Sequence, residues 1–190
     1  MKPNLIDLLR DALNIMRMRY QVAEAYDYGL PVFVAVMFAV GAINAVAMTP
    51  LFGNSPAAFA FGVLMSLTRW LVLTRMAAEI LRPHKSPRIP FLGYTLAGEA
   101  LVLPQVLVFY FETWALPLSL WATWAFWAQA IGFYHISQQS MGKVAVVYVA
   151  HWLVSVVLMS VFLAMFVAEG WFDWTMIEVN FKKYTDLYAK

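Results

Sequence analysis

Long apolar stretches recur along the chain, and they indicate the fold class before any single residue is considered. Five stretches of about twenty residues carry almost no charge: 31–49, 57–81, 91–111, 116–136 and 144–168. A helix rises about 1.5 Å per residue, so each can cross a hydrocarbon core of about 30 Å. Lipid offers no partners for backbone N–H and C=O groups, and these runs lack the alternation of barrel strands. The pattern predicts an all-α membrane protein, a bundle of five transmembrane helices within residues 29–170.

The two ends of the chain show different patterns. The N-terminal pattern places five apolar positions on one helical face: Leu5, Leu9, Ala12, Leu13 and Met16. Asp7 and Asp11 fall on the opposite face. Such a helix is too short and too charged to span, so residues 1–28 are predicted to form an interfacial amphipathic helix on the cytoplasmic side. Residues 171–190 alternate aromatic and charged positions and are predicted to form a non-cytoplasmic tail.

Basic residues are distributed unevenly between the predicted loops. The N-terminal segment, the second loop and the fourth loop hold the basic residues near the spans: Lys2, Arg10, Arg17, Arg19, Arg82, Lys85, Arg88 and Lys143. The loops 50–56 and 112–114 contain no Lys or Arg, whereas Lys182, Lys183 and Lys190 lie beyond the last span, where the bias weakens. The positive-inside rule predicts a cytoplasmic N-terminus and a C-terminus on the opposite side. We expect a multi-pass protein of a bacterial inner membrane, with a periplasmic C-terminus.

Composition narrows the functional classes. The chain is 63% hydrophobic and 13% charged, well outside the range of soluble domains. A net charge of +2, with the basic residues in short loops, argues against a nucleic-acid partner. The absence of Cys excludes disulfides, thiolate metal sites and a Cys nucleophile. No phosphate-binding loop or Ser-His-Asp arrangement can be nominated, so we predict that the protein is not an enzyme.

Ionisable residues inside the predicted spans are the best candidates for function, because charge at membrane depth is costly. The second span carries Arg69 and Arg75, and the third carries Glu99 and Gln105. Counting from the loop between the two spans predicts an Arg75–Glu99 ion pair. Arg69 is expected to reach Gln105 or a carbonyl freed by the preceding proline. This intramembrane polar cluster has two interpretations: a clamp between two helices, or a proton, ion or anionic-ligand site around Arg69.

Two histidines and a glutamine form a second group of polar residues in spans. His135 lies near the end of the fourth span and His151 about two turns into the fifth. A bis-histidine haem needs two imidazoles on opposite faces of one porphyrin, and no second motif supports such a site. We therefore predict no cofactor and no metal. Packing hydrogen bonds are the preferred interpretation, His135 with Gln139 and His151 with Gln129.

Two segments resemble a known family. Residues 124–149, WAFWAQAIGFYHISQQSMGKVAVVYV, and residues 91–104, FLGYTLAGEALVLP, are similar to bacterial members of the Yip-domain (Ypt/Rab-interacting protein) family. The resemblance implies five spans, an outward C-terminus and a small non-enzymatic membrane protein that works by assembling with other membrane proteins or lipids. The Gly-Tyr pair and the proline stand farther apart here than in eukaryotic members. The long cytosolic region that would meet a GTPase is missing, so Rab binding is not implied.

Three functional hypotheses follow. The leading one is a membrane scaffold or accessory subunit, whose partners are membrane lipids, other membrane subunits or further copies of itself. The second is a carrier or channel for a small ion or anionic lipid, lined by the intramembrane polar cluster. The third is a cofactor-bearing subunit of a membrane redox complex.

Overall fold

The computed structural model describes residues 3–83 and 87–188, and over these ranges the chain is helical and contains no strand. The α-helices are α1 (Leu5–Met16), α2 (Leu30–Ala47), α3 (Thr49–Phe52), α4 (Pro56–Ile80), α5 (Leu92–Glu99), α6 (Ala115–Ser137), α7 (Met141–Ala168) and α8 (Trp174–Tyr188). Three segments are 3₁₀ helices: η1 (Ala23–Ala25), η2 (Ala100–Phe109) and η3 (Glu112–Trp114).

Four helical segments are long and apolar enough to cross a membrane. They are α2, α4, the continuous pair α5–η2 and α7. They correspond to the first, second, third and fifth predicted stretches. The fourth stretch forms α6, which is 23 residues long but less apolar than the other four segments. Three indoles and the Gln129 amide lie along α6, and these polar groups make its transfer into hydrocarbon less favourable.

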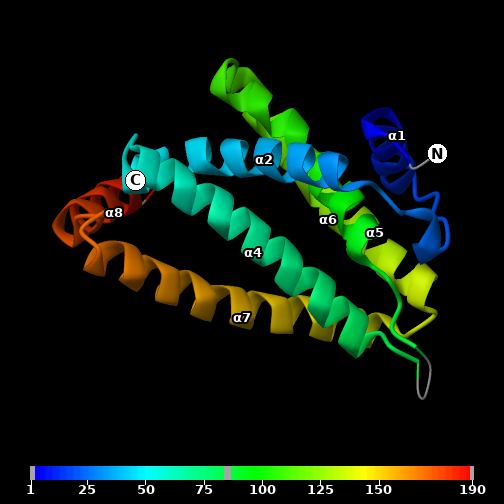
Figure 1. Cartoon of the computed structure of the whole chain (residues 1–190). Coiled ribbons are helices and arrows are strands. Elements are labelled where there is room, and N and C mark those ends of the chain that lie inside the picture. Colours follow the sequence, from blue (N-terminus) through cyan, green and yellow to red (C-terminus); the bar gives the residue numbers. More distant parts are fainter. Residues whose placement is uncertain (1–2, 84–86, 189–190) are drawn as a thin grey trace.

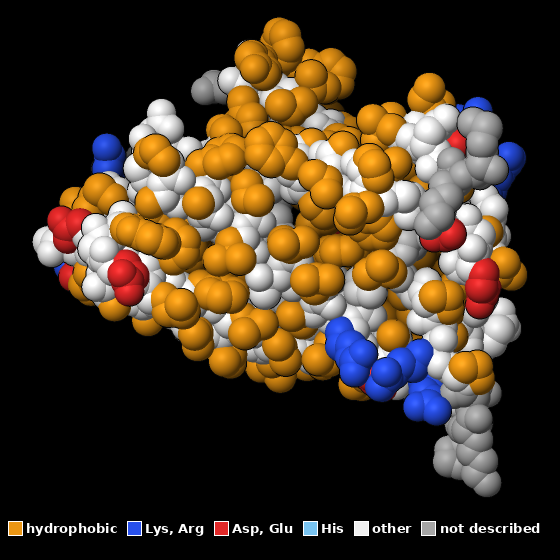
Figure 2. Space-filling view, viewed as in Figure 1, with side chains coloured by type: hydrophobic (Ala, Val, Ile, Leu, Met, Phe, Trp, Pro, Cys, Tyr) orange, Lys and Arg blue, Asp and Glu red, His pale blue; other side chains and the backbone are white. Residues whose placement is uncertain are grey.

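Helix α4 lies at the centre of the arrangement, packed against α2 on one side and α7 on the other. These three helices run between the same two ends of the molecule, with α1 at one end and α8 at the other (Figure 1). The α5–η2 segment and α6 form a hairpin that crosses α2 and projects beyond it (Figure 1). Hydrophobic side chains cover most of the visible face, including the tip of this hairpin (Figure 2).

Small residues allow α2 and α4 to approach closely. A Cβ on Gly62 would stand 2.5 Å from Cα of Ala45, and a Cβ on Gly41 would stand 2.9 Å from Cα of Val63. Close backbone approach of this kind is a main source of helix association in lipid. The Asn44 amide also donates to Oγ of Ser66 (2.9 Å), so the interface combines close packing with a polar contact.

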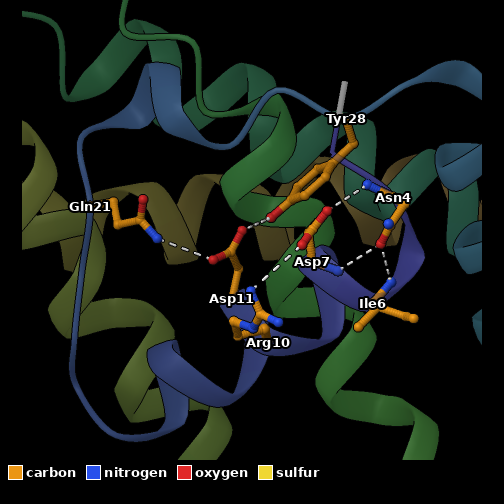
Figure 3. A network of polar contacts seen from close by, with 7 residues as sticks. All are labelled: Asn4, Ile6, Asp7, Arg10, Asp11, Gln21 and Tyr28. Carbon is orange, nitrogen blue, oxygen red and sulfur yellow. Dashed lines mark hydrogen bonds and ion pairs between the residues drawn. The ribbon is translucent and has the colours of Figure 1, made fainter. Parts of the chain in front are cut away.

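Helix α1 begins with a capping box. Oδ1 of Asn4 accepts from the backbone N–H groups of Ile6 (2.8 Å) and Asp7 (3.0 Å), and Asp7 accepts from the Asn4 N–H in return (Figure 3). One turn later, Asp11 accepts from the Tyr28 hydroxyl (2.7 Å) and the Gln21 amide (3.1 Å) (Figure 3). Burial and the Asp11 carboxylate raise the pKa of Tyr28. These contacts fix α1 to the connector that leads into α2.

The apolar residues of α1 fall into a buried group and an exposed group. Leu8, Ala12, Ile15 and Met16 are buried, whereas Leu5, Leu9 and Leu13 are exposed. The helix packs on α5, η2 and α6, so neighbouring helices decide which of its apolar residues become core. The indole of Trp124 donates to the carbonyl of Met16 (2.9 Å), and the Tyr20 hydroxyl donates to the carbonyl of Ala128 (2.8 Å).

A second, aromatic core lies at the other end of the molecule. The rings of Phe52, Phe61, Phe166 and Phe172 pack with centroid separations of 5.1–5.4 Å. Ile177 of α8 joins this core, and the Asn180 amide donates to the Leu51 carbonyl (3.1 Å). The predicted tail is therefore a helix that docks on α3, within the residues the structure describes.

Replacing Gly62 with Ala should loosen the contact between α2 and α4. The new methyl group would overlap the Ala45 backbone, and overpacking typically costs about 1–3 kcal/mol. We expect a lower melting temperature in detergent micelles. The matched control is Gly142→Ala, where the nearest atom to the new Cβ is 3.8 Å away, and which should be neutral or slightly stabilising. Equal melting temperatures for the two variants would contradict this packing.

Candidate functional site

Polar side chains from four helices meet around one lateral cavity. Arg69 comes from the middle of α4, Glu99 from the end of α5, Gln129 from α6 and His151 from α7. All four line a cavity of about 470 Å³ whose remaining walls are largely apolar. A volume of this size is within the range of ligand and docking sites.

A second cavity reaches the same polar groups from another side. It has a volume of about 260 Å³ and is lined by Gln105 and Gly98 together with Arg69, Glu99 and Gln129. Three polar residues are common to both cavities and form the centre of the site. We call Arg69, Glu99 and Gln129 the polar centre.

A change of helix type places Glu99 in this position. Pro104 has no N–H, and its ring would clash with the carbonyl of Ala100, four residues earlier. The α-helix ends at Glu99, and the chain continues as the 3₁₀ helix η2, which contains Pro104. Glu99 therefore stands at the junction of the two helix types.

Gln129 connects α5, α6 and α7. Its Oε1 accepts from the Tyr148 hydroxyl (3.1 Å), and its backbone carbonyl accepts from the Tyr94 hydroxyl (2.8 Å). Its amide nitrogen lies against Gly98, where a Cβ would overlap it. A Cβ at this position of α5 would force the Gln129 amide to shift.

Arg69 and Glu99 are less well satisfied. Neither side chain makes a hydrogen bond or ion pair with any residue that the structure describes, although the Arg69 charge interacts at longer range with Glu99 and His151. Arg69 is exposed and Glu99 is half-buried, so both open into the cavities. His151 has a partner of its own, since Nδ1 lies 3.3 Å from Oγ of Ser155.

The predicted ion pair between Arg75 and Glu99 is wrong. Arg75 pairs with Glu79, one turn further along α4 (3.1 Å), and Glu79 also pairs with Arg88 (2.6 Å). The side chain of Arg75 is 61% exposed and does not line the cavities of the polar centre. Arg69 and Arg75 are six residues apart, so they project from α4 in different directions. The structure brings Arg69, Glu99 and Gln105 together and leaves Arg75 outside.

Hydroxyl groups form the contact between α4 and α5 that the ion pair was expected to make. Oγ1 of Thr95 accepts from the Trp70 indole (3.0 Å) and lies 2.6 Å from Oγ1 of Thr74. All three residues are buried. Uncharged polar groups, two hydroxyls and one indole, therefore make this contact between the two helices.

The two histidines line different cavities. The imidazole of His135 stacks on the ring of Tyr20 at 5.4 Å, beside a cavity of about 700 Å³ near the N-terminal connector. Its carbonyl accepts from the side chain of Gln138, the neighbour of the predicted partner Gln139. Neither histidine makes the hydrogen bond predicted for it. Within the described residues, no group of three or more His, Asp or Glu is placed to hold a metal ion.

Two residues of the site escaped the sequence analysis. Tyr148 stands three residues before His151 and Ser155 four residues after it. Both line the cavity of about 470 Å³ at the polar centre. A spacing of three and four residues is the signature of one helical face. This polar stripe on an otherwise apolar span was the available signal.

No family model, curated protein or solved structure matches the chain. The resemblance to the Yip-domain family gains no support from these comparisons.

Replacing Tyr148 with Phe should remove the hydrogen bond to Gln129 while keeping the ring. Hydrogen bonds between membrane helices contribute about 0.6 kcal/mol on average and up to about 1.7 kcal/mol. We expect a small decrease in melting temperature in detergent. Tyr110→Phe, at a residue that is 76% exposed, should have no effect. A Tyr148→Phe protein as stable as the wild type would show that this bond does not hold α6 to α7.

Proposed function

We propose that this chain is a non-enzymatic integral membrane scaffold or accessory subunit that assembles laterally with other membrane components. One observation carries the proposal. Arg69 lies near the middle of the 25-residue helix α4, is exposed to a lateral cavity, and lacks a hydrogen bond or ion pair with any described residue.

Lipid tails are a poor environment for this side chain. An arginine at the bilayer centre costs about 2.5–3.5 kcal/mol even by insertion measurements, and it normally faces protein or water. Contact with a polar group of another molecule would offset that cost. The helix on the other side of the cavity, α7, supports the same proposal: 11% of its most apolar window is buried, against 33–44% in the other three spans. Lipid alone can cover an apolar face, so α7 by itself would not decide the matter.

The proposal includes a topology of five crossings. The α5–η2 segment leads away from the end at which α7 begins, so α6 must return the chain to that end (Figure 1). Its 23 residues would extend about 35 Å, enough for a crossing. The residues Arg82 and Arg88 then lie with α1 on the cytoplasmic side; Lys2, Lys85 and Lys190 lie outside the described residues. This arrangement fits the expected bacterial inner membrane.

Reporter fusions test the topology. We expect a reporter that is active only outside the cytoplasm to be active after residue 190 and inactive in the loop after α4. A reporter fused after α6 should be inactive as well, because α6 ends on the cytoplasmic side. Activity at that last position would show that α6 does not cross the membrane.

A carrier for a small ion or anionic lipid is the second candidate. The observation that favours it is the pair of cavities that meet at the polar centre, because a path needs access from two sides. Vesicles containing the purified protein would show flux that disappears in Arg69→Ala. Absence of flux would exclude the carrier.

Removing the Arg69 charge should weaken assembly. After extraction in mild detergent, we expect the wild type to elute as a complex larger than its 21.6 kDa chain, with or without another protein. In Arg69→Ala, the amount of complex should fall about tenfold, equivalent to about 1.4 kcal/mol of lost contact. Arg75→Ala is the matched control, since Arg75 pairs within its own helix, and should leave the complex intact. A monomeric wild type would remove the proposal.

A further inference from the structure

We propose that the partner at the cavity is a second copy of this chain, and that Arg69 of each copy pairs with Glu99 of the other. This inference rests on the proposed assembly function and names its partner. It starts from the polar centre, which holds one cation and one carboxyl group that are not paired with each other. A symmetric dimer requires a self-complementary patch, and this pair of opposite charges supplies one.

The membrane makes this pairing geometrically simple. Two copies inserted with the same topology can be related only by a two-fold axis along the membrane normal. Under that symmetry, a residue meets partner residues at its own depth. Arg69 and Glu99 line the same two cavities and are close enough for their charges to interact, so their depths are similar and both pairs can form at once.

Apolar side chains of α7 surround the charges on the same side. Trp152 is 63% exposed and lines the cavity with Val156 and Met159. Tryptophan and arginine are among the residue types that dominate interface energies. These side chains would shield the two ion pairs from lipid. They would also provide apolar contact area between the two chains, which the charges alone cannot.

A lipid headgroup fits the site less well. Headgroups lie at the surface of the hydrocarbon core, about 15 Å from its centre, whereas Arg69 stands near the middle of α4. A carboxylate carried at mid-depth by a second protein chain can contact the guanidinium without either group leaving the middle of the membrane. Glu99 is such a carboxylate, and every copy of the chain carries it.

Charge reversal in trans tests the dimer. In R69E and in E99R, each homodimer would place like charges opposite each other. The dissociation constant of the dimer should therefore rise at least about tenfold. When R69E and E99R chains with different tags are co-expressed, both pairs are restored, and each tag should capture the other chain at the wild-type level. R75E combined with E99R should not be rescued, because Arg75 lies outside the site.

An intramolecular pair gives the opposite result. If Arg69 paired with Glu99 of its own chain, the double variant R69E/E99R would recover wild-type behaviour in the capture assay. The co-expressed single variants R69E and E99R would not. That outcome would overturn the inference. So would native mass spectrometry in nanodiscs showing a monomer with an anionic lipid that is lost in R69E.

Cross-linking tests the dimer without changing any charge. The chain contains no Cys, so one introduced thiol has only its copy in the partner to react with. Met159→Cys, on the cavity rim, should form a disulfide-linked dimer when membranes are treated with a mild oxidant that accepts the two electrons and two protons of the thiol pair. Val157→Cys, which is 60% exposed but does not line the cavity, should remain monomeric. Equal cross-linking at both positions, or none at Met159→Cys, contradicts the inference. If a different protein is captured instead, the assembly function stands and the homodimer does not.

Discussion

Hydrocarbon cannot hydrogen-bond, and this constraint governs which polar side chains the helices carry and where these side chains lie. Within the described part of the chain, no buried side-chain nitrogen or oxygen lacks a partner. Hydroxyls and amides meet this requirement at several helix contacts, as Thr95 does between α4 and α5 and Gln129 does between α5, α6 and α7. Arg69 and Glu99 differ because their polar atoms face cavities, where a partner can still reach them.

Two kinds of packing hold together the helices around Arg69 and Glu99. At one interface, glycine and alanine let the α2 and α4 backbones touch, which gives dispersion contacts that lipid cannot replace. At the end that carries α8, large aromatic rings interlock and attach that helix to α3, α4 and α7. Beyond the aromatic core, α7 lies at the periphery, with 11% of its most apolar window buried. The site therefore has one wall packed between neighbouring helices, α4, and one wall with a broad uncovered face.

The assembly proposal and the homodimer inference use different parts of this arrangement. Assembly needs only that a mid-span guanidinium gains a partner from outside the chain. The homodimer adds that the partner's carboxylate lies at the same depth, which the two-fold symmetry of co-inserted chains would ensure. The 3₁₀ segment that begins after Glu99 supports this step, because Pro104 fixes the point where α5 ends and so fixes the depth of the carboxylate.

The sequence by itself determined the helical class, the length of the spans and the presence of mid-span charge. Each depends on how a segment interacts with its solvent, which can be read from length and composition. Only the tertiary structure decided which side chains meet, such as Arg75 with Glu79 and Thr95 with Trp70. A rotation of about 100° per residue about the helix axis separates these outcomes. In spans that are apolar on all sides, the contacts of neighbouring helices set that rotation, and the hydrophobic pattern does not.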